Sequence, residues 1–550
     1  MKRISTLIFL LSIVQISNAQ WVNDPMINTL AAQGQECVDP IAVADSSGNT
    51  YISYRLPNGG GYSVYIQKVD AQGYAQWGSS GKLVSDDDHT QTYTTFYATA
   101  IDPTNHAIVA WEDSRTGNAD IFASRISPDS NLVWGNSGLQ LSFGAAFDAA
   151  PQILPMPDST TIIGWQSEDS TGIYLQRISR DGTRMWGLNA FLHYDHTGSA
   201  MHFYSVPRLA LCNDTSFYLV FKRANASFNA SQTALSINKF GLSGQTLWAS
   251  NIDFQSAGAV PNFLTMNASA DGNEGCIVSW MDSHGGSFYL DGFVQHIDAG
   301  GNSLLAANGQ NVVAVAGSLA LGNIASAQDD AGNIYAFYTT STELYAQKID
   351  VNGNLLFGSN GALLASTSNS FSQLNAVRTH RGFIITCAED LVTQPSTYFA
   401  ALIDTSGNLV WSTPLLPVSS ITSIKSNATL TEEKNNQVVL AWQDTRSGVS
   451  TDIYVQNISV DGFLGVGMKN IQASGISIFP NPVQNSFTLK LPFAKSAEIK
   501  LFSATGQCVK LWQQNNQVSQ YNVANLPEGF YFVQLTDDQG QKTFPLQIVR

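Results

Sequence analysis

The segment Ala107–Leu141, AIVAWEDSRTGNADIFASRISPDSNLVWGNSGLQL, is one copy of a unit that recurs along most of the chain. An alternating apolar run ends at Trp111, a polar turn follows, and a second run leads to Asp129 and then to Trp134. Related segments are TIIGWQSEDSTGIYLQRISRDGTRMWG, from Thr161, and QVVLAWQDTRSGVSTDIYVQNISVDG, from Gln437. Recurrence at a period of about 55 residues indicates a repeat architecture.

Two mostly aromatic positions mark the units. The first anchor position ends the second predicted strand and is occupied by Tyr54, Trp111, Trp165, Phe221, Trp280, Tyr338, Cys387 and Trp442. The second anchor position follows an Asp/Gly turn and is occupied by Trp21, Trp77, Trp134, Trp186, Trp248, Leu305, Phe357 and Trp411. Of the 11 tryptophans, only Trp512 lies outside these positions, so we interpret the anchors as core packing between repeats.

Each unit reads as four strands separated by turns such as Asp45–Asn49 and Asp350–Asn354, in which Asp bonds back to the turn backbone and Gly accepts positive φ. Four-stranded units of this length predict the blades of a β-propeller within an all-β fold. The last unit lacks its second anchor, whereas Gln20-Trp21 matches Gln76-Trp77 with no strands before it. An N-terminal strand that completes the last blade gives eight blades and no open edge. Seven blades is the alternative if the unit around Cys387 is irregular.

Strand parity sorts the connections of such a blade. Second-to-third loops and blade-to-blade crossings share one face, and nearly all the variation in loop length falls there, in segments such as 111–120, 190–206 and 281–292. Variable loops on a rigid scaffold are where binding usually resides. We therefore expect any binding function on this face.

The N-terminus predicts a signal peptide. Lys2 and Arg3 precede an apolar run, and Ser17-Asn18-Ala19 suits cleavage between Ala19 and Gln20. No stretch is long enough for a transmembrane helix. The predicted organisation is a signal peptide at 1–19, a propeller at 20–466, a linker at 467–475 and a second domain at 476–550.

The composition excludes several partners. A formal net charge of -15 argues against nucleic acid and anionic membranes. The 5 cysteines show no metal-binding spacing, so we interpret them as buried and inert. No cofactor is predicted.

The second domain has alternating strands and Gly turns that predict a small Ig-like β-sandwich. It contains the motif residues Pro480, Asn481, Pro482, Gly506, Leu526, Gly529, Tyr531 and Lys542. In this order and spacing they resemble the type A C-terminal sorting domain of the type IX secretion system. The resemblance implies a Bacteroidota-type cell, contact with the type IX machinery, and passage through the periplasm to the outer surface or the medium.

Carboxylates recur in the second-to-third loops, and they are the candidate chemistry of the binding face. The candidate residues are Glu112, Asp113, Arg115, Asp282, Asp444 and Arg446, with Glu168, Asp169, Glu389 and Asp390 in related loops. A glycosidase needs two carboxyl groups about 5–10 Å apart. However, Asp-x-Arg-x-Gly recurs in register at Asp113 and Asp444, which favours Asp as a turn cap paired with Arg.

Three further patterns are weaker. Tyr54–Pro57 resembles a sialidase signature, but no matching Asp box accompanies it. The loop His193–His196, with His202, could bind zinc but matches no metal motif, so we expect exposed loop residues. Asp86–His89 could hold calcium, although an acidic loop is more often only solvated. We assign no catalytic residue and no metal ligand.

The sequence therefore favours a non-catalytic, secreted or surface-displayed propeller that binds a glycan or a protein through its loop-rich face. The alternative is a secreted polysaccharide-acting hydrolase that uses the loop carboxylates. A structural surface-layer component is a third reading.

Overall fold

The computed structural model describes residues 21–34, 36–59, 61–86, 97–168, 172–193, 202–225, 233–255, 266–282, 290–314, 321–391, 396–448, 450–465, 477–491, 496–503, 507–537 and 540–550. These residues form β-strands and no helix, so the all-β prediction is confirmed. The chain divides into two compact units, with the boundary between Val466 and Gly467.

The first unit contains, among its described residues, eight four-stranded sheets, which we number along the chain. Sheet 1 contains β2 (Val38–Ala44), β3 (Thr50–Asn58), β4 (Gly61–Val69) and β5 (Lys82–Ser85); sheet 2 contains β6 (Ala98–Ile101), β7 (Ala107–Asp113), β8 (Asp120–Ile126) and β9 (Leu139–Gln140). Sheet 3 contains β10 (Asp148–Pro155), β11 (Thr161–Ser167), β12 (Ile173–Ile178) and β13 (Phe191–His193); sheet 4 contains β14 (His202–Asn213), β15 (Ser216–Asn225), β16 (Thr233–Gly241) and β17 (Ile252–Gln255).

The second half of the unit repeats this order. Sheet 5 contains β18 (Met266–Ala270), β19 (Cys276–Asp282), β20 (Asp291–Ile297) and β21 (Gln310–Asn311); sheet 6 contains β22 (Asn323–Gln328), β23 (Ile334–Thr339), β24 (Glu343–Ile349) and β25 (Ala362–Ser366). Sheet 7 contains β26 (Ser370–Thr379), β27 (Gly382–Asp390), β28 (Ser396–Ile403) and β29 (Leu416–Ser423); sheet 8 contains β30 (Lys425–Leu430), β31 (Gln437–Asp444), β32 (Asp452–Ser459) and β1 (Thr29–Ala32). The sheet around Cys387, sheet 7, has the same four-strand order as the others, with register shifts between β26 and β27 and between β28 and β29.

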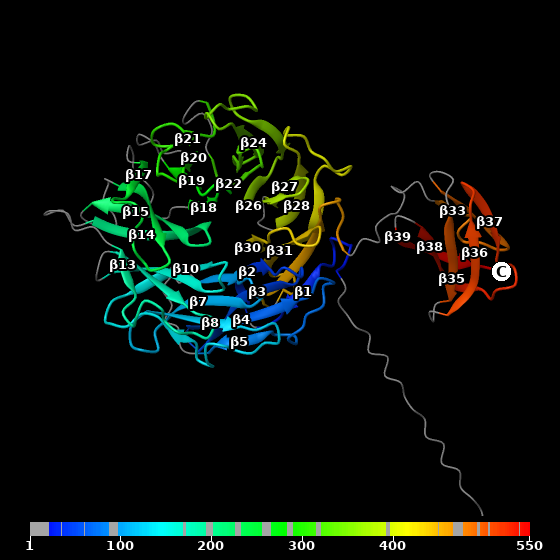
Figure 1. Ribbon diagram of the computed structural model, residues 1–550, viewed down its shortest axis with the longest axis horizontal. Helices are drawn as coiled ribbons and strands as arrows, with labels where there is room; N and C mark the ends of the chain where they lie inside the picture. The colour runs from blue at the N-terminus through cyan, green and yellow to red at the C-terminus, as the bar shows by residue number, and fades with distance from the viewer. Residues whose placement is uncertain are drawn as a thin grey trace, which may run out of the picture. The chain divides into compact units, whose positions relative to one another are not determined.

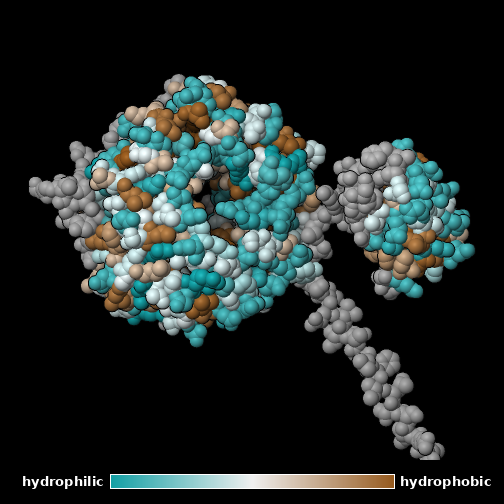
Figure 2. Space-filling model, viewed as in Figure 1, coloured by the Kyte–Doolittle hydropathy of each residue, from teal (hydrophilic) through white to brown (hydrophobic). Residues whose placement is uncertain are grey.

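The eight sheets stand around a common centre (Figure 1). Their first strands contact one another in turn: β2 contacts both β6 and β30, and the contacts continue through β10, β14 and β18. The sequence of contacts resumes from β22 through β26 to β30, while β22 reaches the preceding sheet through β19. Figure 2 shows an opening at the centre of this unit. First strands such as β6 and β22 are largely half-buried, whereas β7, β8, β19 and β20 are buried along their whole length.

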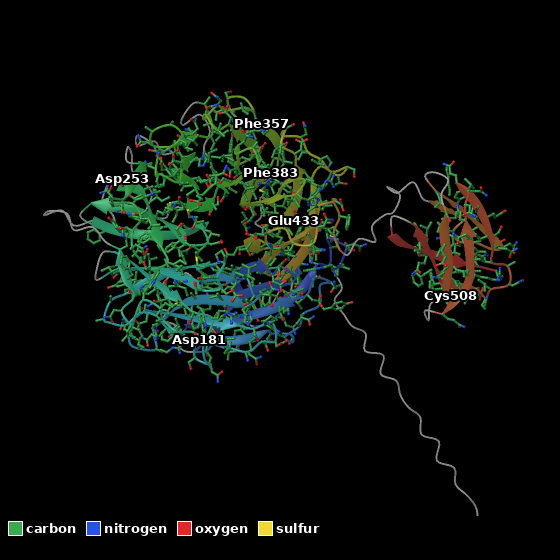
Figure 3. The ribbon with its side chains drawn as sticks, in the orientation of Figure 1. Asp181, Asp253, Phe357, Phe383, Glu433 and Cys508 are labelled. Atoms are coloured by element: carbon green, nitrogen blue, oxygen red, sulfur yellow. The ribbon has the colours of Figure 1, made fainter. Side chains whose placement is uncertain are left out.

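The buried layers are those that the anchor positions predict. All eight residues of the first anchor position are nearly inaccessible, and each packs between its own sheet and a neighbour. Sheets 6 and 7 illustrate this packing, because Phe357 and Phe383 both contact Tyr335, with ring centroids 6.2 and 4.3 Å away. Figure 3 labels both phenylalanines. Aromatic side chains therefore pack between neighbouring sheets together with aliphatic residues.

The N-terminal segment closes sheet 8. Thr29 pairs with Val455 and Leu30 with Tyr454, so β1 is the fourth, antiparallel strand of the sheet that begins at β30. Trp21 precedes this strand, as Trp77 precedes β5. It packs in one cluster with Val439 and Val455 of sheet 8 and with Val69 of sheet 1.

Two recurrent contacts show that Trp21 is the second anchor of sheet 8. The indole Nε1 of a second anchor donates to a turn carbonyl of the following sheet, from Trp134 to Arg180 at 3.2 Å and from Trp21 to Ala71 at 3.0 Å. A third-strand glutamine also donates to the residue after the anchor, Gln176 to Gly187 at 2.8 Å and Gln456 to Val22 at 2.7 Å.

Antiparallel order gives the first unit two faces. First-to-second and third-to-fourth connections share one, which we call the turn face, while second-to-third loops and crossings share the other, the loop face. On the turn face, Asp329 Oδ1 accepts from the N–H groups of Ala331 and Asn333, at 3.0 and 2.9 Å. Although burial acts to raise it, these bonds and those from the Asn333 and Tyr335 side chains lower the pKa of Asp329.

The second unit contains two sheets. One contains β33 (Ser477–Phe479), β34 (Ser486–Lys490) and β37 (Val518–Asn522). The other contains β35 (Ala497–Ser503), β36 (Cys508–Gln514), β38 (Gly529–Asp537) and β39 (Gly540–Ile548). Phe487 and Leu489 of the first sheet share one core with Ile499 and Val533 of the second.

All five cysteines are free; four are buried, while Cys508, labelled in Figure 3, is exposed, which corrects the expectation of buried thiols for this residue. The part of the chain that the structure describes has no helix able to cross a bilayer.

Trp21→Ala is expected to lower the free energy of unfolding of the first unit by about 3–5 kcal/mol, because it empties a buried site between sheets 8 and 1. Chemical denaturation followed by circular dichroism measures the loss. Trp77→Ala is the matched control, since Trp77 occupies the same anchor position but is half-buried, and its loss should be smaller. Equal losses would contradict the assignment of Trp21 to ring closure.

Candidate binding face

Three of the predicted carboxylates lie at the ends of second strands on the loop face, where each is held by the first anchor. Trp111 Nε1 donates to Asp113 Oδ2 at 3.1 Å, and Trp442 donates to Asp444 at 2.9 Å. Asp282 accepts in the same way from Trp280, at 2.6 Å. All three carboxylates are buried. Their common partner is thus a structural side chain of their own sheet.

The two predicted arginines complete this arrangement. Arg115 Nε donates to Asp113 at 2.8 Å and its guanidinium carbon lies 4.2 Å from the Phe122 ring centroid. Arg446 Nε donates to Asp444 at 2.9 Å and stacks 3.9 Å from the centroid of Tyr454. A guanidinium that stacks on a ring while pairing with a carboxylate is strongly preorganised.

Sheet 8 adds a buried cation to its carboxylate. Lys425 Nζ lies 3.7 Å from Asp444 and donates to the carbonyl of Ser396 at 2.9 Å. Burial lowers the pKa of Lys425 to about 8, against the opposing charge of Asp444. Burial acts to raise the pKa of Asp444, but bonds from Arg446 and Ser423 and the charge of Lys425 hold it below its usual value. A cavity of about 490 Å³ adjoins Lys425, with Gln373, Asp390 and Ser396 in its lining.

Glu112 connects two sheets. Its Oε1 accepts from the backbone N–H of Ala150 in sheet 3, at 2.9 Å. Gln166 and Gln443, which also follow first anchors, accept at the same position from Val206 (3.0 Å) and from Asp39 (2.9 Å).

The three donors of these bonds have an unusual backbone. Asp39, Ala150 and Val206 have φ of 53°, 55° and 53°, and each begins a bulge in a first strand, immediately before a proline. Non-glycine residues with positive φ carry strain that neighbouring contacts must hold in place. The side chain after the anchor therefore fixes the bulge of the next sheet.

Two recurrent polar positions were missed in the sequence, although an alignment of the repeats would show them. The third-strand glutamines occur in YIQKVD, YLQRIS, FVQHID, YAQKID and YVQNIS. The acceptors Glu112, Gln166 and Gln443 each directly follow a first-anchor tryptophan. The hydrogen bonds of the glutamines join the third strand to the segment before the fourth, and those of the acceptors join neighbouring sheets. The recurrence of the aromatic anchors alone does not predict these bonds.

The other candidate carboxylates are dispersed. Glu168 is exposed at the end of β11. Glu389 accepts from Asn369 at 2.8 Å and from the Thr367 hydroxyl, and Asp390 accepts from Ser396 at 2.6 Å. Asp169 lies outside the described residues.

The weaker patterns resolve differently. Arg55 of the Tyr54–Pro57 segment pairs with Asp39. His193 is not an exposed loop residue as expected: it is buried in β13, within 5.5 Å of the ring centroids of Tyr204, Phe221 and Phe240. Within the described ranges no three His, Cys, Asp or Glu side chains form a metal-binding group. Residues 194–201, Asp87, Asp88 and His89 lie outside these ranges.

The sorting-motif residues bridge the two ends of the second unit. Asn481 donates to the carbonyl of Pro545 at 2.9 Å and accepts from the N–H of Gln547 at 2.9 Å. The Tyr531 hydroxyl donates to Pro527 at 3.0 Å, and Leu526 packs on the core. Pro480 and Pro482 follow cis peptide bonds, and Gly529 begins β38. Gly506, the Lys542 side chain and the cleavage residues Ala19 and Gln20 lie outside the described residues.

Comparisons with known proteins identify the second unit. Residues 477–549 match the family model for the secretion system C-terminal sorting domain, which confirms the resemblance to a type IX sorting domain. This tail directs the protein through the periplasm to the outer cell surface or the medium and implies contact with the secretion machinery. The preceding region matches no family model.

No curated protein matches the chain. Among solved structures it is similar to a protein of unknown function from Dyadobacter fermentans, at 10% identity over 82% of this chain and 100% of the other, with a TM-score of 0.35. The β-propeller domain of the Trilobed protease from Pyrococcus furiosus is 8% identical over 70% of this chain and 99% of its own, with a TM-score of 0.37. A thermostable family-43 glycoside hydrolase is 14% identical over 50% and 94%, with a TM-score of 0.29.

Glu112→Gln is expected to leave the free energy of unfolding within about 0.5 kcal/mol of the wild type. The reason is that Gln166 and Gln443 accept the equivalent hydrogen bonds from the N–H groups of Val206 and Asp39. Glu112→Ala should cost about 1–3 kcal/mol, since the buried N–H of Ala150 loses its acceptor. Chemical denaturation measures both, with Glu168→Ala as the exposed control. A large loss for Glu112→Gln would show that the charge itself is required.

Proposed function

We propose that residues 20–466 form an eight-bladed β-propeller that binds a glycan or a protein on its loop face without catalysis, and that 476–550 form an Ig-like sorting domain. Residues 1–19 act as a signal peptide in a Bacteroidota-type cell, 467–475 are a linker, and the mature protein is released or displayed at the surface. The eight four-stranded sheets and the pairing of β1 with β32 support the blade count and the closed ring.

One observation supports the non-catalytic assignment most strongly. A hydrolase of this design needs two loop-face carboxyl groups able to face a substrate. Asp113, Asp282 and Asp444 are instead buried acceptors of anchor indoles, and Glu112 accepts from a backbone N–H of the next sheet. Residues that repeat by register and bond to the scaffold serve the scaffold.

Deletion of residues 476–550 should leave the first unit folded but retained in the periplasm, because the sorting tail is confined to the second unit. Cell fractionation with immunodetection measures the distribution, and limited proteolysis checks the fold. Surface appearance of the truncated protein at the wild-type level would contradict this prediction.

The mature chain should retain ligands without turning them over. Binding is measured with a glycan array and by capture of cell-surface proteins on the immobilised mature chain. Hydrolysis is measured by a reducing-sugar assay on the glycans that bind. The combined variant Glu112→Gln, Asp113→Asn and Glu168→Gln should lower the melting temperature yet leave the affinity per folded molecule unchanged. Hydrolysis by the wild type that this variant abolishes would instead establish the hydrolase.

A further inference from the structure

Sheet 3 contains a cavity of about 270 Å³ on the loop face, at the place where sheets 2 and 8 contain an arginine. The lining includes Ser142, Asp148, Trp165, Ser167, Tyr174 and Asn189. Phe143 and Leu188, 46% and 58% exposed, form an apolar rim. All these residues lie in the described part of the chain.

The cavity walls correspond to the groups that surround the arginines. Trp165 pairs with Tyr174 across β11 and β12, as Trp111 pairs with Phe122 and Trp442 with Tyr454. A serine of the preceding sheet accepts from the guanidinium in both filled sites, Ser85 at 2.9 Å and Ser419 at 3.2 Å. Ser142 occupies that position beside sheet 3.

The fourth strand supplies another matching wall. Arg115 Nη1 donates to the carbonyl of Ser137 at 2.9 Å, and Ser137 lies three residues after Trp134. Asn189 lies three residues after Trp186 and lines the cavity. Sheet 3 therefore retains the enclosure of an arginine site.

Sheet 3 lacks the Asp-x-Arg motif that fills the equivalent site in sheets 2 and 8. Ser167 stands where Asp113 and Asp444 follow their tryptophans, and Asp169 stands at the register position of Arg115 and Arg446. A carboxylate is nevertheless present, because buried Asp148 pairs directly across from Ser167. Lys425 has the corresponding position opposite Asp444 in sheet 8.

The indole of Trp165 gives a second, independent indication of a missing group. Trp165 is 1% exposed, and among the described residues its Nε1 has no hydrogen-bond partner. The equivalent indoles of Trp111 and Trp442 donate to a carboxylate oxygen. A buried donor without an acceptor is costly, so the occupant has to bring an oxygen as well as a cation.

We propose that this cavity binds an arginine side chain from a partner protein, together with an oxygen acceptor from the same segment. The guanidinium stacks on Tyr174 and faces Asp148, while a backbone carbonyl or carboxylate of the segment accepts from Trp165. This inference rests on the proposed binding function and narrows its ligand to a protein carrying an exposed arginine turn. The net charge of -15 favours approach of a basic segment.

We favour arginine over lysine and over a hexose as the occupant of the cavity. A lysine ammonium lacks the planar group that stacks in sheets 2 and 8 at 4.2 and 3.9 Å from a ring centroid. A hexose could bond Trp165 and Asp148, but the chain itself provides no precedent for it, whereas it fills the equivalent enclosure twice with arginine.

The test uses the chain's own turn as the probe. A capped hexapeptide copying residues 112–117, Glu-Asp-Ser-Arg-Thr-Gly, is titrated into the full mature chain by calorimetry and ligand-observed NMR. We expect a dissociation constant of about 1 mM, the range of a single anchored side chain. The same peptide with lysine in place of arginine should bind at least about 10-fold more weakly.

Two variants and one matched control locate the binding. Tyr174→Leu removes the ring face and Asp148→Asn removes the charge, and each should weaken peptide binding about 10-fold. Tyr454→Leu makes the same substitution at the same register position of sheet 8, where Arg446 already fills the site, and should leave the dissociation constant within about twofold. Circular dichroism confirms that each variant is folded.

The proposal would be overturned by no binding of the arginine peptide, by equal binding of the lysine peptide, or by binding that Tyr174→Leu does not affect. Methyl hexosides that bind and compete with the peptide in a Tyr174-dependent way would replace arginine with a sugar and overturn it too. The proposed non-catalytic function is judged separately, by the reducing-sugar assay.

Discussion

The pairing of β1 with β32 is the constraint on which the first unit depends. Each sheet buries its two surfaces against its neighbours, so a ring with one incomplete member would expose the strand edge of sheet 8 and the apolar surface of Val439 and Val455. Trp21 fills that surface and reaches the turn of sheet 1. The Gln456 amide, 434 residues away in sequence from its acceptor at Val22, fixes the register.

Inside this ring, ionised groups are used as structural parts. Asp113 and Asp444 each gather an indole N–H and a guanidinium, which balances a buried charge without leaving polar groups unsatisfied. Glutamine and glutamate substitute for each other at the acceptor after the anchor, because the bond needs an oxygen and not a charge. Asp113, Asp282 and Asp444, three of the carboxylates that suggested hydrolysis, thus have structural partners in their own sheets.

Much of the fold could be predicted from the sequence, since the anchors and Asp/Gly turns recur with a long, clear period. The N-terminal closure followed from one orphan motif, although the strand itself is Thr29–Ala32, eight residues beyond Trp21. The site could be predicted only in part. The Asp-Arg pairing was visible as a repeated motif, whereas the cavity of sheet 3 depends on residues brought together from two sheets, and its signal is a departure from the repeat at Ser167. His193 was misplaced because its burial depends on aromatic residues far along the chain.

Closure by the N-terminal strand also sets an order on folding. Local pairs such as β3 with β4 join residues close in sequence and can form early, but the last sheet must bring together segments at opposite ends of the first unit. Pairing β1 with β32 closes a loop of most of the first unit and carries an entropic cost that local strand pairs do not have. We therefore expect completion of sheet 8 to be the slow step of folding. Until then, the strand edge of β32 stays open and Trp21 lacks its contacts with sheets 8 and 1. The closed form of the first unit can therefore appear only when the segment containing β1 and the segment from β30 to β32 are both free to meet.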